Sequence, residues 1–347
     1  MEFNFGGVKE NIITSDEFSL EKARQVLKKE VIAVLGYGIQ GRAQALNMRD
    51  NGFNVIIGQR PGRSYDQAVE DGWVPGKTLF PLEEAAKKGT IIQYLLTDAG
   101  QKDNWPKVKA ALEEGDLLEF AHGFSITFKE QTGVIPPAFV DVGLIAPKGS
   151  GASVRTNFLS GNGINSSFAV YQDHTGKAEL RLTALGIAMG SGFLFPTTVE
   201  KEAVSDLVGE RGVLMGALEG IIEAQYLTLR AHGHSPSEAF NETVEELTES
   251  LIRLVGAKGM DYMFANCSET ARIGALRWAP RFRDTVRPLF ESLYDAVKAG
   301  DETRIVLEES KTPSFKAKLE AQVSGMGSSE LWKAGQVVRD LRPTERA

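Results

Sequence analysis

Two pairs of carboxylates in the second half of the sequence have the spacing of a metal site. Asp206 and Glu210 are four residues apart, and so are Glu242 and Glu246. Residues four apart share one face of a helix, where like charges repel by about 0.2–0.5 kcal/mol unless something neutralises them. Mg²⁺, which prefers oxygen ligands, would neutralise them. The four acids are therefore candidate ligands of a magnesium site.

The first pair lies in an apolar setting. The segment 202–220 is predicted to be one helix, with glycines three or four residues apart along it. Small residues let helices pack closely, so we expect this helix to be buried on several sides. Because burying an unpaired charge is expensive, Asp206 and Glu210 need a metal or other partners. The alternative is an ordinary charged helix face.

The second pair has a stronger alternative. Two neighbouring acids make the helix around Glu242 and Glu246 acidic on all sides, which is also typical of a solvated helix. Spacing alone leaves open a third pair as well, formed by Glu219 and Glu223.

A glycine-rich loop near the N-terminus has the pattern of a dinucleotide-binding turn. The apolar run Val31–Leu35 precedes Gly-Tyr-Gly-Ile-Gln-Gly at 36–41, and a predicted helix over Arg42–Asn51 follows. Gly52 ends that helix, and Phe53–Ile57 is predicted to be the next strand. In this context the fingerprint predicts a dinucleotide whose pyrophosphate lies at the helix N-terminus. The alternative is a turn with incidental glycines.

The glycines of this loop have distinct expected roles. Gly36 permits a tight turn, Gly38 lets the backbone approach the pyrophosphate, and Gly41 allows close packing of helix on strand. Tyr37 and Gln40 complete the cofactor contacts that we expect from the loop.

The end of the second predicted strand indicates which dinucleotide binds. NAD enzymes usually carry an acid there, which binds the ribose 2′-hydroxyl. Here the segment 59–64 reads Gln-Arg-Pro-Gly-Arg-Ser and contains no acid. Arg60, Arg63 and Ser64 instead suit a 2′-phosphate, since guanidinium groups bind phosphate in bidentate geometry. The loop predicts NADPH, and the alternative is a basic surface loop.

Further segments continue the alternation of strand and helix. Four more strands are predicted, at Thr90–Leu96, Leu117–Ala121, Phe139–Leu144 and Ser167–Tyr171. Right-handed parallel connections would make them a doubly wound, Rossmann-like α/β sheet. The ligand of such a sheet binds at the carboxyl ends of its strands.

Three residues follow those strands directly. His122 and Gly123 come after one strand, and Lys148 lies in a loop rich in Pro, Gly and Ser after another. His122 is a candidate catalytic residue, Gly123 a candidate cofactor contact, and Lys148 a candidate clamp for a phosphate or carboxylate. A structural histidine and a surface lysine are the alternatives.

The sequence changes character after about Pro196, where strand signals end and helical ones dominate. We expect a dinucleotide-binding domain over 1–196 and an all-helical domain over 197–347. Ser268 is expected near the N-cap of a helix, and Leu331–Leu341 is expected to be the last helix.

Composition excludes several other classes of protein. The 347 residues exceed what a single core usually holds, and the net charge of −7 disfavours nonspecific binding to nucleic acid or anionic membranes. The single cysteine, Cys267, excludes an intrachain disulfide. No apolar run is long enough for a transmembrane helix. Met1–Glu10 lacks the features of a targeting peptide, so we expect a cytoplasmic protein, with a processed organellar form left open.

The motifs taken together resemble those of ketol-acid reductoisomerase (acetohydroxyacid isomeroreductase). The segments that carry the resemblance are Gly36–Gly41, Ala121–Phe124, Pro147–Gly151, Ser205–Gly212 and Asn241–Glu246. The resemblance extends from about Ala33 to Asp340 and indicates a short, fungal-type member with a single helical domain. Ile39 and Arg42 stand where Ser and His are common in the family, which bears on cofactor preference.

The resemblance implies roles for the candidate residues. Asp206, Glu210, Glu242 and Glu246 would bind two Mg²⁺ ions, and Asp206 would bridge both. Ser268 would contact the substrate carboxylate.

Further implications concern the other site residues and the assembly. His122 would lie near substrate and cofactor, and Lys148 would belong to the metal-bound network. Glu242, Glu246 and Ser268 would come from a second subunit, which implies an obligate homodimer or a larger homo-oligomer. The helical domain would be knotted, which general folding rules do not predict.

The implied reaction belongs to valine and isoleucine biosynthesis. It converts 2-acetolactate to 2,3-dihydroxyisovalerate, and 2-aceto-2-hydroxybutyrate to 2,3-dihydroxy-3-methylvalerate. A base removes the hydroxyl proton, an alkyl group migrates to the neighbouring carbonyl carbon, and NADPH reduces the new keto group. Glu210 and Glu246 are the candidate bases.

Two rival interpretations remain. A metal-free β-hydroxyacid dehydrogenase would explain Lys148 but would leave the four paired acids without a role. A non-catalytic dinucleotide-sensing module would need the glycine loop alone. Dependence on Mg²⁺ separates the first from the isomeroreductase, and tolerance of Asp206→Asn would favour the second.

Overall fold

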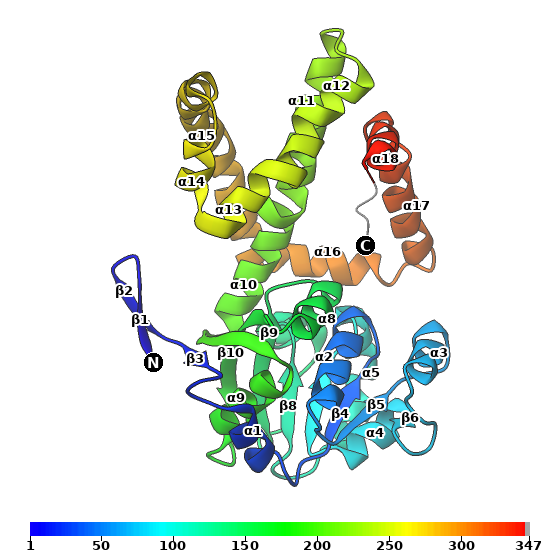
Figure 1. Cartoon of the computed structure of the whole chain (residues 1–347). Helices are drawn as coiled ribbons and strands as arrows, with labels where there is room; N and C mark the ends of the chain where they lie inside the picture. Colours follow the sequence, from blue (N-terminus) through cyan, green and yellow to red (C-terminus); the bar gives the residue numbers. More distant parts are fainter. Residues whose placement is uncertain (344–347) are drawn as a thin grey trace. The chain divides into compact units, whose positions relative to one another are not determined.

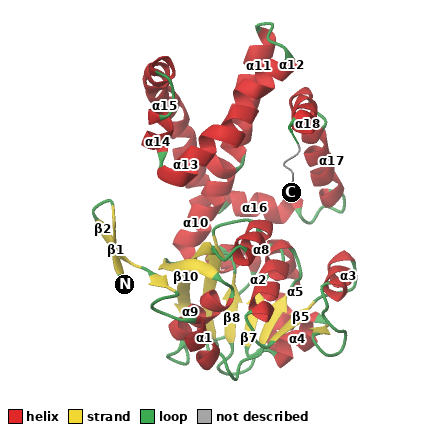
Figure 2. Ribbon diagram, in the orientation of Figure 1, coloured by secondary structure: helices red, strands yellow, loops and turns green. Residues whose placement is uncertain are grey.

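The computed structural model describes residues 1–343 and divides into two compact units, Met1–Asp206 and a second that begins at Leu207. The first contains a nine-stranded sheet with helices, and the described elements of the second are all helices (Figures 1 and 2). The expected combination of a Rossmann-like part and an all-helical part is confirmed. The boundary between the two units falls within α10 (Val199–Gly209). The sequence predicts a domain boundary after residue 196. None of the described helices is long and apolar enough to cross a membrane.

The sheet of the first unit has the strand order β3-β11-β10-β9-β8-β7-β4-β5-β6. Its strands are β3 (Ile13–Thr14), β4 (Ile32–Leu35), β5 (Val55–Gly58), β6 (Leu79–Phe80), β7 (Ile91–Tyr94), β8 (Leu117–Phe120), β9 (Asp141–Pro147), β10 (Ile164–Gln172) and β11 (Ser191–Pro196). All six strands predicted in this region are present. β3, β6, β11 and the separate N-terminal hairpin of β1 (Glu2–Phe5) and β2 (Val8–Asn11) were not predicted.

Pairing is parallel from β6 through β9 and again between β10 and β11. β10 differs from the expected all-parallel order because it runs antiparallel to β9, with Ser166 opposite Pro147. The connection from β9 to β10 is the short helix α8 (Gly151–Leu159), which returns the chain to the carboxyl end of β9. Two neighbouring strands are antiparallel when the connection between them starts and finishes at the same end of the strands.

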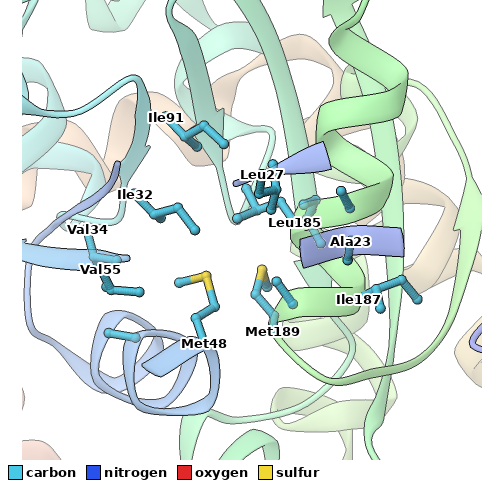
Figure 3. Close-up of a cluster of buried hydrophobic side chains, with 14 of the residues drawn as sticks. Ala23, Leu27, Ile32, Val34, Met48, Val55, Ile91, Leu185, Ile187 and Met189 are labelled. Carbon is cyan, nitrogen blue, oxygen red and sulfur yellow. The ribbon is translucent and has the colours of Figure 1, made fainter. Parts of the chain in front are cut away.

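Apolar side chains fill both faces of the sheet, which explains why its central strands are continuous apolar runs. Successive strand residues point to opposite faces, so Ile32 and Val34 of β4 join one cluster, and Ala33 and Leu35 join the other. In the first cluster, Figure 3 shows Met48 and Met189 near these strand residues. The helices of this unit are α1 (Leu20–Val26), α2 (Ile39–Asp50), α3 (Arg63–Glu70), α4 (Leu82–Lys88), α5 (Asp98–Ala111), α6 (Phe124–Thr127), α7 (Lys129–Thr132), α8 and α9 (Ala178–Ala188).

The second unit has its own small core, in which Ile222, Tyr226, Phe240, Val244 and Leu331 are buried. Its helices after α10 are the π-helical turn η1 (Glu210–Leu214), α11 (Gly216–Ala231), α12 (Pro236–Phe240), the π-helical turns η2 (Asn241–Glu245) and η3 (Leu247–Leu251), α13 (Ile252–Lys258), α14 (Met260–Ala265), α15 (Glu269–Ala299), α16 (Asp301–Glu309), α17 (Phe315–Gly327) and α18 (Glu330–Leu341). α18 agrees with the predicted last helix.

The single helix predicted over 202–220 is wrong. α10 ends at Gly209, and Gly212 leaves helical geometry with φ −85° and ψ −131°. A Cβ on Gly212 would lie 2.9 Å from the Phe290 ring, so a side chain at this break would displace that ring. Val213 and Leu214 are 68% and 65% exposed. In the single chain this segment is therefore not buried on several sides, contrary to expectation.

Candidate active site

Four ionisable side chains of the first unit converge on one point. His122 follows β8, Lys148 follows β9, and Glu202 and Asp206 lie four residues apart on α10. A carboxylate oxygen of Glu202 lies 3.1 Å from Nδ1 of His122, and the other lies 2.7 Å from Nζ of Lys148. Asp206 lies 3.2 Å from the same imidazole nitrogen and 3.5 Å from Lys148 Nζ. The cluster therefore stands at the carboxyl ends of neighbouring strands, where α/β sheets bind their ligands.

Glu202 is the centre of this cluster, and it was not among the predicted site residues. Its side chain is 1% exposed, and its Oε2 also accepts a hydrogen bond from the backbone N–H of Gly123 at 2.7 Å. Protein donors thus occupy both of its oxygens. A signal was present in the sequence, because Glu202 lies four residues before Asp206 and so extends the spacing that selected Asp206 and Glu210.

The pKa values of the cluster follow from this pairing. Burial alone would lower the pKa of His122, but the hydrogen bond to Glu202 and the charges of Glu202 and Asp206 raise it to about 9. Burial would likewise raise the pKa of Glu202, but His122 and Lys148 lower it to about 2. At neutral pH a cationic His122 therefore faces an ionised Glu202.

Gly123 allows the loop after β8 to lie directly against α10. A Cβ at this position would be 2.4 Å from the carbonyl oxygen of Val199 and 3.1 Å from Cβ of Ala203. Only glycine permits this approach, which brings the Gly123 N–H within hydrogen-bonding distance of Glu202. The cofactor contact predicted for Gly123 stays a prediction.

Asp206 is the member of the cluster whose chemistry suits Mg²⁺. The candidate ligand atoms of His122, Glu202 and Asp206 all lie within 4.8 Å of one another. Glu202 is buried with both oxygens occupied, whereas the Asp206 side chain is 28% exposed and a carboxylate has about four acceptor positions. The donor set therefore fits a metal-binding Asp206, with Glu202 orienting the histidine and the lysine.

Glu210 begins η1, directly after α10 ends. The pair that it forms with Asp206 in the sequence therefore straddles the boundary between the units. Within the second unit, Nη1 of Arg211 lies 3.8 Å from Glu210, while Nε of Arg211 binds Glu302 at 2.7 Å. The role of Glu210 as a metal ligand stays a prediction.

The acids around η2 separate into two classes. Glu245 and Glu249 form ion pairs with Arg342. Glu242 and Glu246 are exposed, line one groove of about 250 Å³, and form no ion pair within the described residues. The pair selected by spacing is thus the pair whose carboxylates have no cationic partner there, and this arrangement suits ligands of a metal.

The glycine-rich loop has the geometry that the fingerprint predicts. Gly36 has φ +103°, and a Cβ on Gly41 would lie 1.9 Å from the carbonyl oxygen of Gly36. Gly38 is the N-cap of α2 and has no atom within 4 Å of where its Cβ would be, so the helix N-terminus is open to a ligand. These features suit a pyrophosphate at this site.

The side chains of Tyr37 and Gln40 turn into the protein. The Tyr37 hydroxyl donates to Asp71 at 2.8 Å and accepts from Nε1 of Trp73 at 2.8 Å. Gln40 donates from Nε2 to the carbonyl oxygen of Gly149 at 2.9 Å. The backbone N–H of Tyr37 donates to Oε1 of Gln59 at 2.8 Å, so the cofactor contacts of Tyr37 and Gln40 stay predictions.

The three residues predicted to bind a 2′-phosphate line two hollows. Arg60 lines one of about 520 Å³ with Gln59. Arg63 and Ser64 line another of about 760 Å³, which also includes Gly38 of the glycine loop. Ser268 lies in the second unit, where its hydroxyl caps α15 by accepting from the backbone N–H of Ala271 at 3.2 Å. The N-cap predicted for Ser268 is confirmed.

Comparison with known proteins identifies the family. Residues 26–194 match the family model described as acetohydroxy acid isomeroreductase, NADPH-binding domain, and residues 199–344 match that of the ketol-acid reductoisomerase C-terminal domain. The chain belongs to the ketol-acid reductoisomerase family. The predicted resemblance is thereby confirmed over nearly its whole length.

Individual relatives agree with this assignment. A protein of Desulfosudis oleivorans named ketol-acid reductoisomerase (NAD(+)) is 66% identical, with 99% of this chain and 98% of the relative covered. The mitochondrial ketol-acid reductoisomerase of Saccharomyces cerevisiae is 51% identical, with 99% and 87% covered. The solved structure of an NADH-preferring ketol-acid reductoisomerase from an uncultured archean is 30% identical, covers 95% of this chain and 99% of its own, and superposes with a TM-score of 0.86.

Proposed function

We propose that the protein converts 2-acetolactate to 2,3-dihydroxyisovalerate, and 2-aceto-2-hydroxybutyrate to 2,3-dihydroxy-3-methylvalerate, by Mg²⁺-dependent alkyl migration and reduction by a nicotinamide dinucleotide. The observation that carries the proposal is the cluster of His122, Lys148, Glu202 and Asp206 at the carboxyl ends of β8 and β9. A metal-free dehydrogenase would have no need of a carboxylate set of this kind.

Two Mg²⁺ ions would be held by Asp206, Glu210, Glu242 and Glu246. Bound there, Mg²⁺ would polarise the substrate carbonyl and stabilise the negative charge that develops during migration. Glu242 and Glu246 fit this role because their carboxylates are exposed in a groove and have no ion-pair partner within the described residues. Glu210 or Glu246 would accept the proton of the substrate hydroxyl.

Lys148 and His122 place positive charge beside the acids of the first unit. Glu202 holds Nζ of Lys148 at 2.7 Å and Nδ1 of His122 at 3.1 Å, so neither side chain needs to reorganise when charge appears on the substrate. Preorganised charge of this kind is the largest contribution to the rate enhancement of many enzymes. Lys148 would stabilise the oxygen anion, and His122 would orient substrate and cofactor.

The assembly that we infer is a homodimer, or a larger homo-oligomer, in which Glu242, Glu246 and Ser268 reach the active site of a second subunit. One face of α15 supports this inference, since Trp278, Phe282 and Leu289 share it by helical spacing and are 54–68% exposed in the single chain. Apolar side chains that are exposed together on one face often mark an interface with another protein.

NADPH is the cofactor predicted by the segment 59–64. Arg63 and Ser64 line the hollow that includes Gly38, and Arg60 lines a separate one. Neither arginine forms an ion pair within residues 1–343. Their charge is therefore available to a 2′-phosphate.

NADH is a second candidate, and two of the similar proteins favour it. The 66% identical relative carries NAD(+) in its name, and the solved archaeal structure is described as NADH-preferring. Arginine side chains can also stack on an adenine ring, so their presence is compatible with NADH.

The location of the protein stays a prediction. The cytoplasmic expectation rests on the sequence of Met1–Glu10. The relative from Saccharomyces cerevisiae is named as mitochondrial, so a processed organellar form is the alternative.

The test is to follow oxidation of NADPH and NADH by the purified protein with 2-acetolactate, with and without Mg²⁺. We expect oxidation only when Mg²⁺ is present, and the ratio of kcat/KM values decides between the two cofactors. Oxidation that persists after chelation of all divalent metal would overturn the proposal.

A further inference from the structure

A chain of buried polar side chains runs through the first unit from the sheet to the loop that carries Lys148. Nε2 of Gln93 on β7 lies 3.0 Å from Glu119 Oε2 on β8 and 3.2 Å from Gln44 Oε1 on α2. Nε2 of Gln44 lies 3.3 Å from Oε1 of Gln40, and Nε2 of Gln40 lies 2.9 Å from the carbonyl oxygen of Gly149. Four side chains thus link the middle of the sheet to the loop 147–151.

The direction of every hydrogen bond in this chain is fixed by its end. The carbonyl oxygen of Gly149 can only accept, so the amide nitrogen of Gln40 must face it. Gln40 then presents its oxygen to Gln44, and Gln44 presents its oxygen to Gln93. Reversing any one amide would place two donors or two acceptors against each other. The chain therefore has one arrangement, and it ends on Glu119.

The inner members of the chain lie deep in the protein. Gln44, Gln93 and Glu119 are each 0% exposed, and Glu119 also accepts a hydrogen bond from the backbone N–H of Ile145 at 3.1 Å. Burial, opposed by the hydrogen bonds from Gln93 and Ile145, raises the pKa of Glu119 to about 8. A carboxyl group that is neutral at pH 7 explains how it lies in the sheet without an ion-pair partner among the described residues.

Such a chain is costly unless every member is bonded. A buried polar group left without a partner costs about 1–3 kcal/mol, and an apolar pair of the same size would avoid that risk. In this chain each member is bonded to the next, and Oε1 of Gln93 is the one side-chain oxygen without a hydrogen-bond partner among the described residues. Bonded buried networks impose a single arrangement on the parts they join. The parts joined here are the glycine loop, through Gln40, and the loop 147–151, through Gly149.

A second contact holds the same two loops together. A Cβ on Gly151 would lie 2.1 Å from the carbonyl oxygen of Ile39, so the first turns of α2 and α8 touch through their backbones. The backbone N–H of Lys148 is fixed in turn to the carbonyl oxygen of Asn165 at 2.8 Å. The Lys148 loop therefore has little freedom to move relative to the glycine loop while these contacts are intact.

We propose that Gln40, Gln44, Gln93 and Glu119 are positioning residues, which fix the Lys148 loop against the glycine loop and so set the place of the Lys148 amine relative to a bound dinucleotide. This inference rests on the proposed function for the roles of the lysine and the dinucleotide. None of the three inner residues needs to touch substrate or cofactor for the chain to act.

The test replaces Gln44 by methionine, which has a similar size and no strong hydrogen-bonding group. Gln44→Met deprives Gln40 of its donor and Gln93 of one acceptor. We expect backbone hydrogen exchange at residues 147–151 to become about tenfold faster, and kcat with 2-acetolactate to fall about tenfold while KM for the dinucleotide changes less than threefold. A small misplacement of reacting groups lowers the rate by this amount or more.

Gln172→Met is the matched control. Gln172 on β10 is half-buried and also donates to backbone carbonyls, those of Pro137 and Val140. It pairs with Val142, at the end of β9 away from the loop 147–151. It is expected to lower thermal stability without changing exchange at 147–151 or kcat. Gln40→Met, at the half-exposed end of the chain, serves as the test if Gln44→Met does not fold.

The exchange measurement needs no substrate, so it separates this inference from the proposed function. If the wild-type protein fails to turn over 2-acetolactate, the proposed function fails while the exchange result still stands. Unchanged exchange at 147–151 in the folded Gln variants, or an equal loss of kcat in Gln172→Met, would overturn the positioning role.

Discussion

Glu202 binds a lysine, a histidine and a backbone N–H with one buried carboxylate. These donors come from two loops: Lys148 follows β9, whereas His122 and Gly123 follow β8. The side chain therefore joins two strand ends to α10. Asp206, one turn further along the helix, shares both cations but remains partly exposed. At the scale of single residues, this division of roles between two carboxylates supports the proposal that Asp206 binds Mg²⁺.

Glu202→Gln tests this division. The substitution removes the negative charge but keeps the size of the side chain, and it leaves Lys148 and His122 close together with Asp206 as their remaining acidic partner. Because breaking a buried ion pair leaves uncompensated charge, we expect a loss of about 2–3 kcal/mol in the free energy of unfolding of the metal-free protein, measured in urea. Glu200→Gln, at an exposed position of the same helix, is the control and is expected to change stability by less than about 0.5 kcal/mol. Equal effects of the two substitutions would contradict the central role of Glu202.

His122 predicts a specific dependence of stability on pH. Its pKa rises from 6.5 in the unfolded chain to about 9 in the folded one, so its protonated form stabilises the folded state. This contribution is complete below pH 6.5 and is lost as the pH rises through 9. We expect the free energy of unfolding of the metal-free protein to fall between these values in the wild type and to fall less in His122→Gln. Identical pH profiles would show that the charge of His122 does not contribute.

At the scale of elements, six of the strands, the glycine loop, the N-cap of α15 and the last helix could be predicted because each rests on a local pattern. Val31–Leu35 is a continuous apolar run, which is typical of a buried parallel strand. The spacing of Gly36 and Gly41 is typical of a dinucleotide-binding turn. The break at Gly212 could not be predicted, because the ring that packs against it belongs to Phe290, far along the chain. The same is true of Glu202, whose partners come from two distant loops.

The segment 59–64, which leads from β5 into α3, allows a test of cofactor preference. If Arg60 and Arg63 bind a 2′-phosphate, replacing each by alanine removes a charge-assisted contact worth about 1.5–3 kcal/mol. We expect KM for NADPH to rise at least tenfold and KM for NADH to change less than threefold in the same variants. NADH is thus an internal control for folding. Equal changes for both cofactors would mean that the arginines do not contact the 2′ position.

At the scale of the whole molecule, the candidate ligands are divided between two compact units of the chain, with Asp206 at the end of the first and Glu242 and Glu246 in the second. The second unit exposes apolar side chains along α15. The proposed dimer with shared sites would explain both features, since a second copy would cover the apolar face and bring its own acids. The resemblance suggested this assembly, and no local sequence pattern could have revealed it.

Mixing two inactive variants tests the shared site. Asp206→Asn and Glu246→Gln are each expected to abolish activity alone. In a mixed dimer with one copy of each, one site would carry both lesions and the other would carry none. After co-refolding at equal amounts, we expect activity to return to about a quarter of the wild-type value, because about half of the dimers are mixed and each has one intact site. No recovery in dimers that are shown to be mixed would place all four acids in one subunit.

The carbon skeleton of the product tests the central claim most directly. Wild-type protein is incubated with ¹³C-methyl-labelled 2-acetolactate, Mg²⁺ and reduced dinucleotide, and the product is examined by NMR. If the site catalyses migration before reduction, the product is 2,3-dihydroxyisovalerate, with two methyl groups on the same carbon. If the product is instead 2,3-dihydroxy-2-methylbutanoate, in which the methyl group has not moved, then the site only reduces a ketone and the proposed isomerisation is wrong.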